Sequence, residues 1–143
     1  MTELPQHSVS VTAIPIDDQG RALLVQRRDN GRWEPPGGVL ELDETIEAGA
    51  AREAFEETGV KVEVQQLTGI YKNLRLGVVA LVFRAKVVSG EPRPTPEAQD
   101  VQWLTRDEVI ARVPEVYAAR VLDAMDARDR TPIRHHDGVH IQA

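Results

Sequence analysis

The segment from Trp33 to Gly59 constrains the fold more than any other part of the sequence. Two prolines and two adjacent glycines from Pro35 to Gly38 exclude a regular helix, so this part must be a shaped loop. Helical character begins after Asp43 and continues to Thr58, and Gly59 stands where a left-handed terminating residue is expected. The sequence therefore predicts a loop followed closely by a well-delimited helix.

Three glutamates lie on one face of this predicted helix. At about 100° per residue, Glu56 and Glu57 are roughly −60° and +40° from Glu53. Like charges at these spacings destabilise a helix by roughly 0.2–0.5 kcal/mol per pair, and a divalent cation would offset that cost. Magnesium prefers such oxygen ligands and shares them with substrate phosphates. The alternative interpretation is a merely solvated acidic face.

The surroundings of the acidic face favour the metal site. From Gly38 the sequence runs through five residues to Glu44, then through seven residues to Arg52-Glu53-Ala54-Phe55-Glu56-Glu57-Thr58-Gly59-Val60. This pattern resembles the signature of the Nudix hydrolase family at every fixed position, and Ala54 and Val60 fill its aliphatic positions. The segment before Gly38 and the Glu97–Trp103 region are also similar to the family.

The resemblance implies a role for each residue of the motif. Glu53, Glu56 and Glu57 would bind Mg²⁺, or Mn²⁺, with help from the carbonyl of Gly37. Arg52 would orient a glutamate through its guanidinium group. The remaining motif residues would be structural, because Gly38 lets the backbone approach closely, Glu44 stabilises the loop-helix geometry and Gly59 ends the helix.

Two glutamates are candidates for the general base that activates water. Glu53 is one, and Glu97 is similar in placement to a fourth glutamate that completes the site in some family members. A glutamate in a proline-rich loop is often simply solvated, so both assignments stay open.

Three residues outside the motif are candidates for substrate binding. Arg27 ends a predicted strand near the motif and could meet a phosphate. Trp33 and Tyr71 could stack on a nucleobase, and the alternative for both is a partly buried packing role. Adjacent His135 and His136 could ligate a metal, but a solvated tail or a lid over the substrate is the favoured interpretation.

The rest of the chain predicts one α/β domain over residues 1–143, with a core at about 8–127 and no assignment for the tail at 128–143. Strands are expected at 9–14 and 22–26, paired as a hairpin, and at 60–64, 69–71, 78–88 and 100–104. Helices are expected from Thr105, which begins a capping-box pattern, and from Pro114 to about Ala127. The resemblance implies the Nudix fold, an α-β-α sandwich around a central mixed sheet.

Charge and hydropathy limit the partners. The formal net charge of −6 argues against a broad basic surface for long nucleic acid. The longest uncharged apolar run, at 78–83, is too short to span a bilayer, which takes roughly 20 residues. The first eight residues do not look like a secretory signal and the chain has no cysteine, so we expect a cytoplasmic protein. Homodimers are common among similar proteins.

The substrate is expected to be a small nucleotide-like diphosphate. Family subtypes for ADP-ribose or dinucleoside polyphosphates carry a proline or tyrosine beyond the signature, and the segment 75–78 has neither. Elimination leaves a nucleoside triphosphate, cleaved to the monophosphate and pyrophosphate. The alternatives are an ADP-ribose or nucleotide-sugar pyrophosphatase, or a non-catalytic domain that senses a nucleotide metabolite.

Overall fold

The computed structural model describes residues 3–142, in which the strands form two sheets. The larger sheet is mixed and has the order β4-β1-β6-β5-β8, with β1 (Ser8–Pro15), β4 (Gly37–Val39), β5 (Lys61–Asn73), β6 (Val78–Ser89) and β8 (Ile133–His136). The smaller sheet is antiparallel and has the order β3-β2-β7, with β2 (Ala22–Arg27), β3 (Trp33–Glu34) and β7 (Ala98–Leu104). The helices are α1 (Ile46–Thr58), α2 (Arg106–Arg112) and α3 (Glu115–Met125).

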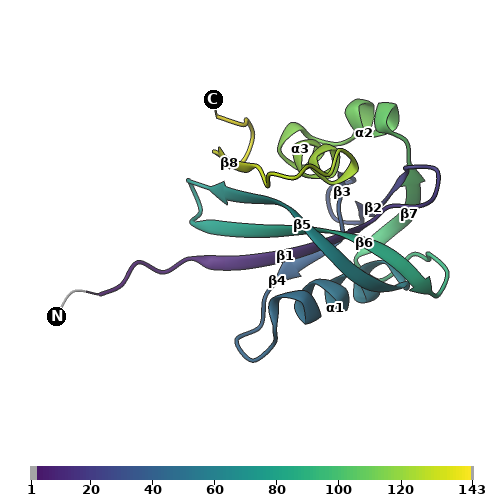
Figure 1. Cartoon of the computed structure of the whole chain (residues 1–143), viewed down its shortest axis with the longest axis horizontal. Helices are drawn as coiled ribbons and strands as arrows, with labels where there is room; N and C mark the ends of the chain where they lie inside the picture. Colours follow the sequence, from purple (N-terminus) through teal and green to yellow (C-terminus); the bar gives the residue numbers. More distant parts are fainter. Residues whose placement is uncertain (1–2, 143) are drawn as a thin grey trace.

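Helices cover both faces of the larger sheet (Figure 1). On one face Ala50 and Ala54 of α1 pack against Val11 and Ala13 of β1, and the small alanines let the helix lie close to the strand. On the other face a second apolar cluster joins the sheet to α2 and α3, and its members include Ile14, Val82, Val109 and Val121. The expected α/β fold with a mixed sheet between helices is therefore confirmed, with a second small sheet added to it.

The predicted hairpin between the first two strands is wrong. Both strands exist, but β1 pairs with β4 on one side and in parallel with β6 on the other. β2 pairs instead with β3 and β7, and a single bridge from Ile16 to Ala22 joins the two segments. Because both hydrogen-bonding edges of β1 are occupied, no edge is left for β2.

The two strands predicted at 60–64 and 69–71 are one long strand, β5. Its pairing with β6 shifts register between Val64 and Leu67 and again between Leu67 and Gly69. Such irregularities interrupt the alternation of side chains between the two faces, so the sequence pattern appeared as two short strands. The predicted strands at 78–88 and 100–104 correspond to β6 and β7.

The helix ends follow the predicted local chemistry. The side chain of Thr45 accepts a hydrogen bond from the amide of Ala48 at the start of α1, and Gly59 ends the helix with φ of +83°. At α2, Thr105 and Glu108 form the complete capping box. These caps set where α1 begins and ends in the chain between β4 and β5.

The C-terminal tail is built into the molecule. β8 pairs in parallel with Ile70–Asn73 of β5, and Arg134 donates two hydrogen bonds of 2.8 Å to Asp123 of α3. His136 is 2% exposed, so the expectation of a solvated tail or lid is wrong at this residue. A strand of four residues with mixed polarity is too short to show an alternating pattern in the sequence.

Candidate active site

Arg52 is the centre of an ion-pair network on the signature helix. Its Nε and Nη2 donate to both carboxylate oxygens of Glu44 at 2.9 and 2.7 Å. Its Nη1 donates to Glu53 at 2.9 Å and to Glu56 at 3.2 Å. The hydrogen bonds from Arg52 lower the pKa of Glu44 to about 2. One guanidinium thus ties the loop before the helix to two of the predicted metal ligands.

The two glycines of β4 lie where side chains cannot fit. A Cβ atom on Gly38 would stand 2.6 Å from the carboxylate of Glu53, and one on Gly37 would overlap the hydroxyl of Thr12. The amide of Gly37 donates to Glu57 at 3.0 Å. The backbone therefore lies directly against two of the three glutamates, the close approach expected from the sequence.

Burial changes the acidity of these glutamates. Desolvation raises the pKa of Glu57 to about 8, against the lowering effect of the hydrogen bond from Gly37. Desolvation also raises the pKa of Glu53, although Arg52 acts in the opposite direction. The negative charge of Glu97 contributes to both increases. A cation placed among these groups would reverse the shift and stabilise the ionised form.

The glutamates offer the chemistry of a magnesium site without forming a closed cage. Glu53 and Glu56 turn toward Arg52, Glu57 turns toward the Gly37 amide, and within residues 3–142 no three acidic or imidazole side chains converge on one point. Magnesium keeps several waters and takes only one or two carboxylates together with substrate phosphates. The donor set, all of it oxygen and partly desolvated, fits such an ion.

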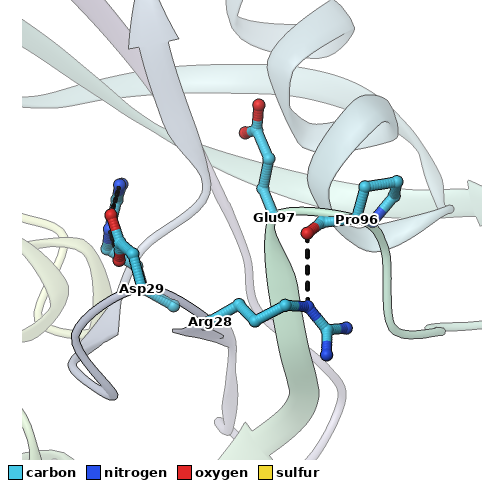
Figure 2. A pocket seen from close by; sticks show the side chains of 5 residues that line it. Arg28, Asp29, Pro96 and Glu97 are labelled. Carbon is cyan, nitrogen blue, oxygen red and sulfur yellow. Dashed lines mark hydrogen bonds and ion pairs between the residues drawn. The ribbon is translucent and has the colours of Figure 1, made fainter.

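Glu97 belongs to the loop before β7, beside a cavity of about 520 Å³ that Arg27, Arg28 and Asp29 also line. Figure 2 shows its carboxylate pointing away from Arg28, whose guanidinium donates to the carbonyls of Pro96 and Thr95 at 3.2 and 3.0 Å. The side chain of Glu97 is exposed. Arg28 thus fastens the loop and leaves Glu97 free to face the site.

Arg27 is engaged by two carboxylates. It donates to both oxygens of Asp29 at 2.9 and 2.7 Å and lies 3.7 Å from Glu34. The hydrogen bonds to Asp29 are the main reason that its pKa is raised. A phosphate would have to compete with Asp29 for this guanidinium, and its role toward a phosphate stays a prediction.

The predicted stacking roles of Trp33 and Tyr71 are wrong in this structure. Tyr71 is fully buried, and its hydroxyl donates to Asp123 at 2.6 Å. Trp33 is 9% exposed and packs in the cluster beneath α2 and α3. Neither ring has a face open to a nucleobase, because both rings are packed in the core.

Sequence reasoning missed a second group of polar residues beside β4. A cavity of about 190 Å³ is lined by Gly37 and by side chains from four other elements, among them Ser10, Thr12, Arg27, Glu34, Tyr117 and Arg120. Arg120 is 9% exposed and shares the buried side of α3 with Val116 and Ala124. An arginine at helical spacing between two apolar residues was the available signal.

The chain matches the NUDIX domain family over residues 6–125. It therefore belongs to the Nudix family, and it is a hydrolase that acts on diphosphate bonds, as members of that family are. A MutT-like protein of Streptomyces ambofaciens is 55% identical over 140 residues, which are 98% of this chain and 90% of the relative.

More distant relatives have different substrates in their names. An ADP-ribose pyrophosphatase of Methanocaldococcus jannaschii is 33% identical over 67% of this chain and 60% of its own length. An oxidized purine nucleoside triphosphate hydrolase of Danio rerio is 32% identical over 69% of this chain and 67% of its own length. A Nudix hydrolase structure from Nitrosomonas europaea covers 94% of this chain and 82% of its own, with a TM-score of 0.80 and 26% identity.

Within residues 3–142, no helix combines the length and the apolar character that crossing a bilayer requires.

Proposed function

We propose that the chain acts as one Nudix domain over residues 1–143 and uses Mg²⁺ to hydrolyse a nucleoside triphosphate to the monophosphate and pyrophosphate. The observation that carries this proposal is the Arg52 network, which holds Glu44, Glu53 and Glu56 around one guanidinium beside Gly38. The likeness to the oxidized purine nucleoside triphosphate hydrolase supports the substrate class.

Each residue has a distinct task in this mechanism. Glu53, Glu56, Glu57 and the carbonyl of Gly37 would hold the ion, which supplies neutralising charge to the phosphate oxygens when bound. Arg52 positions Glu53 and Glu56. A water oxygen forms the new bond to phosphorus while the bond to the bridging oxygen breaks, and a glutamate accepts the proton of that water.

Glu53 and Glu97 compete for the role of proton acceptor. The pKa of Glu53 is raised toward neutral pH, which suits a general base. Glu97 is exposed and unpaired among the contacts of residues 3–142. Replacing the true base by glutamine is expected to lower kcat by about 10²–10⁴-fold and to remove the acidic limb of the pH–rate profile. Measuring both variants, Glu53→Gln and Glu97→Gln, distinguishes the two.

A second candidate is hydrolysis of ADP-ribose or a nucleotide sugar, which the relative from Methanocaldococcus jannaschii favours. A non-catalytic sensor is less well supported, because every glutamate of the signature is present.

The test is a screen for phosphate and pyrophosphate release across nucleotides, nucleotide sugars and dinucleotides with added Mg²⁺. The screen is repeated with Glu56→Gln and Glu57→Gln, and with Glu47→Gln as a control on an exposed position of the same helix. We expect turnover by the wild type and the control only. Equal inactivity of all four proteins would contradict the proposal and favour a sensor.

A further inference from the structure

The cavity beside β4 borders the glutamate site. Gly37 lines this cavity, and the same residue donates its amide hydrogen to Glu57. A ligand group in the cavity would therefore be continuous with phosphates held at the glutamates. The volume of about 190 Å³ is below the roughly 300–1,000 Å³ of pockets that enclose a whole drug-sized ligand, so it suits one ring system.

Arg120, at the wall of this cavity, is a buried cation without an anionic partner. Within residues 3–142 its Nε has no hydrogen-bond acceptor and no carboxylate forms an ion pair with it. Its guanidinium stands 5.3 Å from the ring centre of Tyr71 and 5.1 Å from that of Tyr117. The ring faces attract the charge but accept no conventional hydrogen bond. A buried donor left unpaired costs free energy, so a ligand that supplies a hydrogen-bond acceptor would stabilise Arg120.

The nearest polar atom does not satisfy Arg120 either. Nη2 of Arg120 lies 3.3 Å from Nε2 of His136. Nδ1 of the same ring accepts a hydrogen bond of 3.0 Å from the amide of Gly138, so the neutral ring carries its proton on Nε2. Burial lowers the pKa of His136 and keeps it neutral. Two donors therefore face each other, and the guanidinium still needs an acceptor.

The other charged side chains of the cavity disfavour a phosphate as that acceptor. Arg27 also lines the cavity, but its guanidinium already donates two hydrogen bonds to Asp29. The carboxylate of Glu34, whose side chain is 14% exposed, lines the same space and would repel an anion. A group that suits both Glu34 and Arg120 is neutral, with a hydrogen-bond donor beside an acceptor. Tyr117 also lines the cavity, and an aromatic lining residue favours a planar ring. A nucleobase meets all of these requirements.

We propose that Arg120 and Glu34 recognise the base of the substrate and favour a ring N–H beside a carbonyl over an amino group beside a bare ring nitrogen. A carbonyl oxygen offers two lone pairs to the several N–H donors of the guanidinium, whereas in the other group the bare ring nitrogen offers one lone pair and the amino group offers none. Hypoxanthine, guanine and uracil carry the favoured group; adenine and cytosine carry the other. This inference rests on the proposed hydrolysis of a nucleotide.

Two matched pairs of nucleotides isolate this feature. IMP and AMP differ only in having the carbonyl and N–H or the amino group and bare nitrogen, and so do UMP and CMP. Calorimetric titration in the presence of Mg²⁺ compares the members of each pair on one protein sample. We expect wild type to bind the carbonyl member of at least one pair about tenfold more tightly.

Arg120→Met is expected to bring that ratio close to one. Arg84→Met is the matched control, because Arg84 is also partly buried and donates to a carbonyl of α3, at Ala124, but does not line the cavity. The ratio compares two ligands on the same variant, so partial unfolding affects both equally. Arg84→Met should keep the wild-type ratio.

The inference is overturned if wild type binds both members of each pair equally, prefers the amino member, or keeps its preference in Arg120→Met. Binding is measured without turnover, so the result is independent of hydrolysis. A protein that shows the preference but hydrolyses nothing in the substrate screen would contradict the proposed function and still support the base site.

Discussion

Two arginines next to the Gly37–Gly38 strand have opposite surroundings. Arg52 meets three carboxylates, and one of them, Glu53, touches the position of a Cβ on Gly38. Arg120 lines the cavity that Gly37 also lines, and its nearest polar neighbour is a neutral imidazole. One side of the strand therefore has an excess of negative charge, and the other has a cation that lacks an acceptor.

The difference indicates what each side can bind. A surplus of carboxylates suits a metal ion, and an unpaired guanidinium suits a ligand rich in lone pairs. A nucleotide bridging a metal ion and the cavity would satisfy both sides at once. If the comparison is correct, removing each arginine should have unlike consequences.

The largest effect is expected from Arg52→Met. Glu44 and Glu53 would lose their shared partner, and the glutamates that hold the ion would lose their orientation. Orienting residues of this kind typically change metal affinity or activity by about 10–100-fold. We expect kcat/KM to fall in that range and the metal-free protein to be only slightly destabilised, because solvent screens these ion pairs.

Steady-state kinetics at several Mg²⁺ concentrations and urea titration measure these changes. Arg112→Met removes an exposed arginine that pairs only with Glu108 within the described structure, and it serves as the control. Full activity of Arg52→Met would contradict the proposed difference in role between Arg52 and Arg120.

A smaller effect separates Arg134 from Arg120. Arg134→Met would leave the buried carboxylate of Asp123 with only the hydroxyl of Tyr71, and it should cost about 1–3 kcal/mol. Arg120→Met removes a buried charge without leaving any acceptor unpaired, so its melting temperature should equal or exceed that of wild type. Thermal unfolding of the ligand-free proteins tests this order, and a large loss in Arg120→Met would show that the cation has a partner after all.

The last effect is a pH dependence of metal-free protein due to Glu57. Its pKa in the folded protein is about 8, above the ordinary value of 4.5, so the folded state keeps a proton that the unfolded state has released. The contribution of Glu57 to unfolding free energy therefore falls as pH rises from about 4.5 to about 8. Glu57→Gln should flatten this fall in metal-free protein, and Glu47→Gln should not. An unchanged slope in Glu57→Gln would contradict the assigned burial effect.

The signature helix could be predicted because its determinants are local. The spacing of Glu53, Glu56 and Glu57, together with the stop at Gly59, lies within a few turns of chain. Their placement on one helix needed no knowledge of distant segments. The sequence also predicted that the backbone at Gly37 lies close to the metal site, but not that its amide donates a hydrogen bond to Glu57.

The parts that escaped prediction depend on residues far apart in the sequence. The environment of Arg120 exists only in the folded protein, where β1, β2, β3 and α3 meet around one cavity. Tyr71 looked available for stacking because its partner, Asp123, is 52 residues away. The hairpin failed for the same reason, since β6 takes the edge of β1 that β2 would have needed.

The short pairing of β8 with β5 also affects how the protein behaves in concentrated solution. β8 covers only Ile70–Asn73, so the outer edge of β5 from Lys61 onward has no strand beside it in the described structure. Lys61 and Glu63 place charges along that bare edge, which discourages a second molecule from adding a strand. Truncating the chain before Ile133 would also expose the edge at Ile70–Asn73, where Lys72 is the one charged residue, and would favour self-association.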